Sequence, residues 1–200
     1  MREVQTGLWH WEAPHPEWGP GDSSLEWDRQ EVSSYAIDDG DRLLLFDPLA
    51  LPSEIEELAA DRETAIVLTC AWHERDARSL AERLDAAAFV PQPEEGDPIE
   101  GRQLFTAGDR LPVGVEAFPG REPNDLVLWV ESRRALVAGD TLIDRGPGLE
   151  FPVTWVPDGV TPEQILEALR PLLQLPVEHV LATHGGPTDR AALERALVSA

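Results

Sequence analysis

The fold of this chain is decided by the stretch Ala65-Ile66-Val67-Leu68-Thr69-Cys70-Ala71-Trp72-His73-Glu74-Arg75-Asp76-Ala77. Its first four residues are apolar and two of them are β-branched, which is typical of a strand in the interior of a sheet. Farther on, the apolar residues recur at the spacing of one helix face, which predicts a helix. Polar side chains between such a strand and helix lie at the carboxyl edge of the sheet, where layered α/β folds bind ligands. We therefore expect a ligand site near the side chains of this turn, which are Cys70, Trp72, His73, Glu74 and Arg75.

This stretch and three later motifs resemble the metallo-β-lactamase superfamily. Residues 69–75 are similar to the family's Thr-His-x-His-x-Asp-His signature, with several metal-binding letters changed. Phe118-Pro119-Gly120-Arg121 resembles its Pro-Gly-His motif, Ala138-Gly139-Asp140-Thr141-Leu142 its Gly-Asp-Thr-Leu motif, and Ala182-Thr183-His184-Gly185-Gly186-Pro187 its final His-Gly-Gly motif. The motifs follow in family order over about residues 30 to 190. The resemblance implies an α/β (α+β) fold, a four-layer αββα sandwich whose loops gather along one edge of two facing sheets.

The length and composition predict one domain. A chain of 200 residues with an apolar share of 42% can bury a sizeable core. We interpret residues 1–200 as a single metallo-β-lactamase-like domain, in which residues 1–31 form an irregular, tryptophan-rich N-terminal arm because prolines and glycines interrupt them. The apolar runs fall far short of the roughly 20 residues that span a bilayer, and the N-terminus lacks a secretory layout. With Cys70 as its single cysteine, the chain is predicted to be cytoplasmic.

The strongly acidic charge limits the classes of partner. The formal net charge is −22, from 16 basic and 38 acidic residues. Such a charge repels nucleic acid and anionic membranes. We therefore expect a small-molecule ligand or substrate and neither a nucleic acid nor a membrane partner. The oligomeric state is left open.

Periodicity and turn residues predict the remaining elements. Ser53 with Glu56 predicts a capping box for a short helix through about residue 60. Thr161, Pro162 and Gln164 have the cap, first-position and N3 order of a second helix N-terminus. Residues 144–160 are rich in glycine and proline and predict a long irregular connection over the site. Strands are expected at 32–37, 42–47, 112–118, 125–130, 134–138 and 179–183, an exposed loop at 91–98, and a final helix near 188–199.

The resemblance also identifies the positions at which the family binds its first zinc ion. In this chain those positions carry Cys70, Trp72 and Arg121. An indole cannot ligate zinc and a guanidinium repels it, so only the cysteine could serve. Because such a site needs at least three protein ligands, the first zinc site is expected to be lost.

The family positions for the second zinc ion keep more of their chemistry. They carry Glu74, Arg75, His184 and, at the bridging position, Asp140. Three of these four side chains can still bind a divalent ion through carboxylate oxygen or imidazole nitrogen. A site for one metal ion therefore remains conceivable.

Two functional classes follow. In the first, the site holds no metal, Arg75 and Arg121 neutralise its carboxylates, and the protein of hydrolase descent binds a small, anionic ligand with Cys70, Trp72 and both arginines. In the second, Asp140, His184 and Glu74 hold one zinc, manganese or iron ion, with Cys70 or His73 available as a fourth ligand. The chain would then hydrolyse small esters, thioesters, lactones or phosphoesters. His73 or His184 as general base, with Asp140, is the metal-free version of this enzyme.

Overall fold

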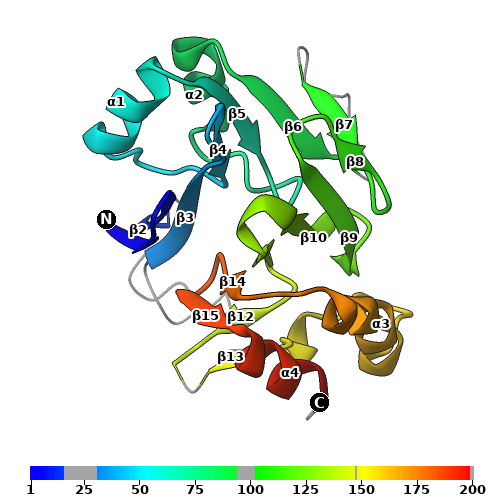
Figure 1. Cartoon of the computed structure of the whole chain (residues 1–200). Coiled ribbons are helices and arrows are strands. Elements are labelled where there is room, and N and C mark those ends of the chain that lie inside the picture. Colours follow the sequence, from blue (N-terminus) through cyan, green and yellow to red (C-terminus); the bar gives the residue numbers. More distant parts are fainter. Residues whose placement is uncertain (16–30, 94–101, 147, 199–200) are drawn as a thin grey trace.

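The computed structural model describes residues 1–15, 31–93, 102–146 and 148–198, and its strands form two main sheets (Figure 1). The first sheet has the order β1-β2-β3-β4-β5-β6-β7 and the second the order β15-β14-β11-β10-β9-β8. The first consists of β1 (Arg2–Gln5), β2 (Leu8–Pro14), β3 (Glu31–Asp38), β4 (Arg42–Phe46), β5 (Glu63–Val67), β6 (Ala87–Pro91) and β7 (Gln103–Phe105). The second consists of β8 (Arg110–Leu111), β9 (Val115–Glu122), β10 (Asp125–Val130), β11 (Ala135–Val137), β14 (His179–Leu181) and β15 (Pro187–Asp189).

Helices cover the outer face of each sheet, so the molecule has four layers. In Figure 1, α1 (Ser53–Ala60) and α2 (Ala77–Leu84) lie beside the first sheet, and α3 (Pro162–Leu169) and α4 (Arg190–Val198) lie on the side of the second. Separate apolar clusters join each pair of helices to its sheet. A third cluster packs β4 and β5 of the first sheet against β10 of the second. This arrangement confirms the predicted αββα sandwich.

Strand β4 illustrates why the apolar runs of the sequence become central strands. Leu44 and Phe46 belong to the cluster between the sheets, whereas Leu43 and Leu45 belong to the cluster under the helices. Successive side chains of a strand point to opposite faces, so a strand covered on both faces needs apolar residues at every position.

Two helix starts are predicted from the same kind of signal, with different outcomes. Thr161 caps α3 with a complete capping box, as predicted. Its hydroxyl accepts from the Gln164 backbone N–H, and the Gln164 side chain accepts from the Thr161 backbone N–H. The prediction of a capping box at Ser53 is wrong. The residue before α1 is Pro52, no side chain caps the helix, and the Ser53 hydroxyl donates to Glu54.

The prediction of an irregular N-terminal arm is wrong for its first half. Residues 2–14 form the antiparallel strands β1 and β2, joined by a turn at Gly7, which has φ 78°. Trp11 is buried and its Nε1 donates to the Leu49 carbonyl oxygen at 2.7 Å. The rest of the arm, with Trp18 and Trp27, lies outside the described residues, as does most of the loop expected at 91–98. Within the described ranges, no helix is long and apolar enough to cross a membrane.

Candidate functional site

The loops that follow four strands meet at one edge of the two sheets. Strand β4 runs parallel to β5 in the first sheet, and β11 runs parallel to β14 in the second. The carboxyl ends of parallel neighbours lie at the same edge, so the loops after these strands converge. They carry Asp47, the segment 69–76, Asp140 and His184.

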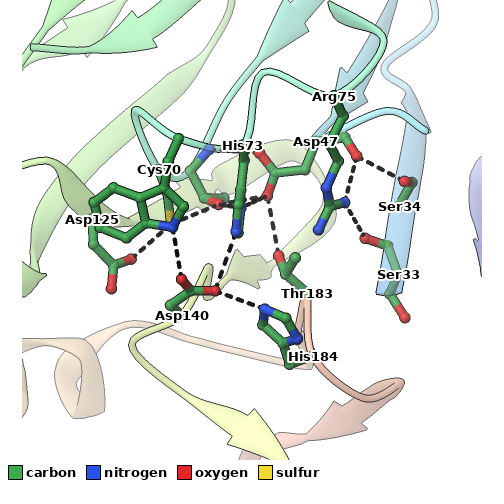
Figure 2. Close-up of polar contacts among 12 residues, drawn as sticks. Ser33, Ser34, Asp47, Cys70, His73, Arg75, Asp125, Asp140, Thr183 and His184 are labelled. Carbon is green, nitrogen blue, oxygen red and sulfur yellow. Dashed lines mark hydrogen bonds and ion pairs between the residues drawn. The ribbon is translucent and has the colours of Figure 1, made fainter. Parts of the chain in front are cut away.

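Asp47, His73, Asp140 and His184 form a continuous line of acidic and basic side chains, here called the carboxylate–imidazole row (Figure 2). His73 Nδ1 lies 3.2 Å from Asp47 Oδ2, and His73 Nε2 lies 3.2 Å from Asp140 Oδ1. His184 Nε2 approaches the same Asp140 oxygen at 3.0 Å. None of the four residues is more than 7% exposed. The row therefore combines one residue pair from each sheet inside the protein.

The row perturbs the pKa values of its members. Burial alone would lower the pKa of His73, but the carboxylates of Asp140 and Asp47 raise it to about 9. Burial tends to raise the pKa of Asp140, yet the adjacent His73 and His184 hold it well below its usual range. Burial lowers the pKa of His184. At neutral pH the metal-free row thus contains an imidazolium between two carboxylates, followed by a neutral imidazole.

Asp47 is the site residue that sequence reasoning missed. Its carboxylate accepts from the Thr69 N–H at 2.9 Å, from the Thr69 hydroxyl at 2.5 Å and from the Thr183 hydroxyl at 3.1 Å, besides its contact with His73. Because these donors directly precede Cys70 and His184, Asp47 fixes the loops after β5 and β14 together. The signal in the sequence was an aspartate directly after the apolar strand 43–46.

The two arginines are anchored differently. Arg75 Nη1 donates to the carbonyl oxygens of Ser33 and Asp47 at 3.0 and 2.8 Å, and burial lowers the pKa of its guanidinium. Arg121 lies beside the row: its Nε donates to Asp125 at 3.2 Å and its Nη2 lies 3.9 Å from Asp140 Oδ2. Its Nη1 also donates to the Trp155 carbonyl oxygen at 2.6 Å.

Cys70 pairs with a carboxylate that sequence reasoning also missed. Its Sγ lies 3.2 Å from Asp125 Oδ1, and the backbones of the two residues form an isolated β-bridge. Burial and three nearby carboxylates raise the pKa of the thiol, which argues against Cys70 as a free nucleophile. Burial, with Asp140 nearby, also raises the pKa of Asp125 to about 7. A charged residue opening the apolar strand 126–130 was the only signal for Asp125.

Two tryptophans flank the row. Trp72 Nε1 donates to Asp140 Oδ2 at 2.9 Å while the side chain remains 44% exposed. Trp155, in the 3₁₀ turn Val153–Trp155, packs its ring edge-on against His184 at 5.8 Å. The Arg121 guanidinium lies 5.7 and 5.8 Å from the two indole centres. The segment 144–160 thus contributes Trp155 to the site and also contains β12 (Ile143–Asp144, beginning one residue earlier) and β13 (Leu149–Glu150).

Glu74 is not brought into the row. Its carboxylate accepts from Arg102 Nη2 at 3.0 Å and from Arg78 Nε at 2.9 Å. A different set of metal-ligating atoms converges: Cys70, His73 and Asp140 each offer one atom, and these lie within 4.8 Å of one another. Thiolate, imidazole and carboxylate are all ligands of zinc and iron.

Solved structures with the same architecture identify the fold. The chain aligns with a metallo-β-lactamase family protein from Thermus thermophilus at 18% identity and TM-score 0.66, covering 98% of this chain and 79% of that one. It aligns with a metallo-β-lactamase from Erythrobacter litoralis, which holds β-mercaptoethanol in its active site, at 15% identity and TM-score 0.68 over 98% and 93% of the two chains. TTHA1623 in a di-iron-bound form is similar at 22% identity and TM-score 0.60 over 83% and 93%.

The chain has the metallo-β-lactamase fold. No protein-family model matches it, and no curated protein matches it significantly. At these identities the likeness establishes the fold, so the chemistry of the site must be argued from its own residues.

Proposed function

We propose that this chain is a hydrolase of small esters, thioesters, lactones or phosphoesters that works at the carboxylate–imidazole row with at most one metal ion. The observation that supports this most directly is the row itself, in which two carboxylates and two imidazoles lie in contact at 3.0 to 3.2 Å. Buried titratable groups with perturbed pKa values cluster at functional sites. The row also lies at the sheet edge where layered folds place their chemistry.

A two-zinc centre does not fit these side chains. At the positions where the family places ligands, Trp72 donates to Asp140, Arg121 donates to Asp125, and Arg75 donates to backbone carbonyls. Hydrogen-bond donors of these kinds carry no lone pair for a metal. Glu74 is paired with two guanidinium groups. One ion remains compatible, held by Cys70, His73 and Asp140.

The side chains of the row suit hydrolysis. Asp140 is held by the indole N–H of Trp72 and contacts His184, whose imidazole can accept the proton of an attacking water. The Arg121 guanidinium, fixed by Asp125, offers a cation for the negative charge that develops on the substrate oxygen. A divalent ion bound beside them would activate the water further by lowering its pKa.

The test is hydrolysis of a panel of short nitrophenyl esters, thioesters, lactones and phosphoesters. Asp140→Asn should lower kcat/KM for the accepted class by at least about 100-fold, the scale of a lost acid–base or charge contribution. Asp61→Asn, at the exposed end of α1, is the matched control and should leave kcat/KM unchanged. Equal rates for Asp140→Asn and wild type would contradict the proposal.

The second candidate is the metal-free binder of a small anion. It is favoured by one observation: Arg75 Nη2 is buried and has no hydrogen-bond partner among the described residues. Chelator-treated protein should then bind acetate or inorganic phosphate, measured by calorimetry, and Arg75→Gln should weaken that binding. A protein that hydrolyses the panel and binds neither anion excludes this candidate.

A further inference from the structure

Cys70, His73 and Asp140 present three different metal-ligating atoms to one point in the protein interior. The three atoms lie within 4.8 Å of one another, and His73 Nε2 and Asp140 Oδ1 are 3.2 Å apart. Ligand atoms on a tetrahedral zinc, bound at about 2.0 to 2.3 Å, lie roughly 3.3 to 3.6 Å apart. Small side-chain movements would therefore bring all three into the first coordination shell of one ion.

Asp140 Oδ1 gives a second indication. This oxygen is buried, in a residue that is 7% exposed, and it faces His73 Nε2 at 3.2 Å and His184 Nε2 at 3.0 Å. Neither contact has the alignment of a full hydrogen bond. A carboxylate oxygen has two lone pairs, so Oδ1 can also accept a cation held beside it by His73 and Cys70.

The surroundings of His73 have the arrangement typical of a metal-bound histidine. Such a histidine usually donates its second ring N–H to a carboxylate, which fixes the ring and its tautomer. Here Nδ1 faces Asp47 at 3.2 Å, and Asp47 is itself held by Thr69 and Thr183. With Nδ1–H donating to Asp47, the Nε2 lone pair is directed toward Asp140 and available to a metal.

The net charge of the site allows two protons to be exchanged for one zinc ion. Binding Zn²⁺ through His73 Nε2 and Cys70 Sγ displaces one proton from each, and both protons leave to solvent. Two positive charges replace two protons, so the net charge of the buried site is unchanged. The ion would have three protein ligands, with a fourth position for water, which is the layout of catalytic zinc sites.

We infer that Cys70, His73 and Asp140 bind a single zinc ion, and that Asp47 is the residue that positions His73 for it. This set of three ligands differs from the ligand positions of the family. His73 takes the place of Glu74 and of the neighbouring side chains, which cannot ligate a metal. The inference deepens the proposed function, since it identifies the one ion with which the hydrolase would work, but its test does not depend on turnover.

The experiment is zinc titration of chelator-treated protein, with metal content measured by mass spectrometry. Wild type should bind one zinc per chain. Cys70→Ala and His73→Ala should weaken binding by more than about 100-fold, and Asp47→Asn by about 10- to 100-fold, the effect of losing an outer-shell carboxylate. Glu74→Gln is the matched control and should retain one zinc with affinity changed less than about threefold.

A measurement on the unmodified chain guards against variants that do not fold. Cobalt-substituted wild type should show the near-ultraviolet absorption of a thiolate–cobalt bond, which only Cys70 can supply because the chain has one cysteine. Absence of this band, absence of zinc binding, or loss of zinc in Glu74→Gln with retention in His73→Ala would each overturn the inference. Bound zinc with no hydrolysis would instead refute the proposed function and leave the metal site standing. Hydrolysis that persists without metal in Cys70→Ala would leave the proposed function standing and would overturn the statement that this zinc is the ion with which the hydrolase works.

Discussion

Raising the pH of the chelator-treated protein from 7 to 9.5 should lower its free energy of unfolding, because His73 loses its proton. The pKa of His73 is raised from 6.5 to about 9 in the folded state. A raised folded-state pKa stabilises the fold fully below the unfolded value and ceases to do so as the pH passes through the folded one. One pH unit in this window is worth about 1.36 kcal/mol. The expected loss between pH 7 and 9.5 is therefore about 2 to 3 kcal/mol.

Urea unfolding followed by circular dichroism at the two pH values measures this loss. For a domain of this size it corresponds to a fall of about 5 to 10 °C in Tm. His10, whose pKa burial lowers to about 4, and His184, whose pKa is also lowered, are neutral in the fold at both pH values, so their unfolded imidazoles add only a small opposing gain just above pH 7. Cys70, whose pKa is raised by burial, stays protonated in the fold and adds to the loss near pH 9.5, where the unfolded thiol ionises. Asp125, with its pKa raised to about 7, adds to the loss only near the lower end, which Asp125→Asn isolates. A free energy of unfolding that stays flat across this range would refute the charge assignment of the row.

Three further changes have defined outcomes. Asp47→Asn should destabilise the metal-free protein by about 2 to 3 kcal/mol in urea unfolding, since it removes one of the two carboxylates beside the buried His73 cation and weakens the acceptor of the Thr69 and Thr183 hydrogen bonds; a loss below about 1 kcal/mol would contradict this. Thr161→Ala should cost about 1 kcal/mol by the same measurement because it removes the cap of α3, and no loss would mean that the capping box contributes nothing. Gly120→Ala should abolish soluble expression or lower Tm by more than 10 °C (on the order of 3 kcal/mol), because a Cβ there would overlap the Asp125 carbonyl oxygen and the Thr141 hydroxyl; an unchanged Tm would contradict it.

The layers of the fold could be predicted because their signal is local. The runs at 43–46 and 126–130 are apolar at every position, which is what a strand covered on both faces requires. The order of four motifs then placed those strands in a known architecture. The start of α3 could be predicted for the same reason, because the side chains of Thr161 and Gln164 each accept from the other's backbone N–H, only three residues away.

The site was only partly predictable because its partners are far apart in sequence. Asp47 and Thr183 are separated by 136 positions, and nothing near either residue indicates their hydrogen bond. Arg75 adopts φ 42°, a left-handed conformation that non-glycine residues rarely adopt, and its guanidinium reaches the Ser33 and Asp47 carbonyls. Glu74 turns instead to Arg102. A position within a motif does not determine which neighbour a long charged side chain will meet.

The carboxylate–imidazole row also affects how the chain folds during its synthesis. Asp47 and His73 leave the ribosome well before Asp140 and His184, so the nascent first sheet holds its acidic and basic groups without their later counterparts. Burying these acidic and basic groups at that stage would leave charges without all of their partners, which is costly. The first sheet should therefore stay open to solvent until translation delivers the second, and a chain stalled after residue 107 should be digested by proteases that the finished protein resists.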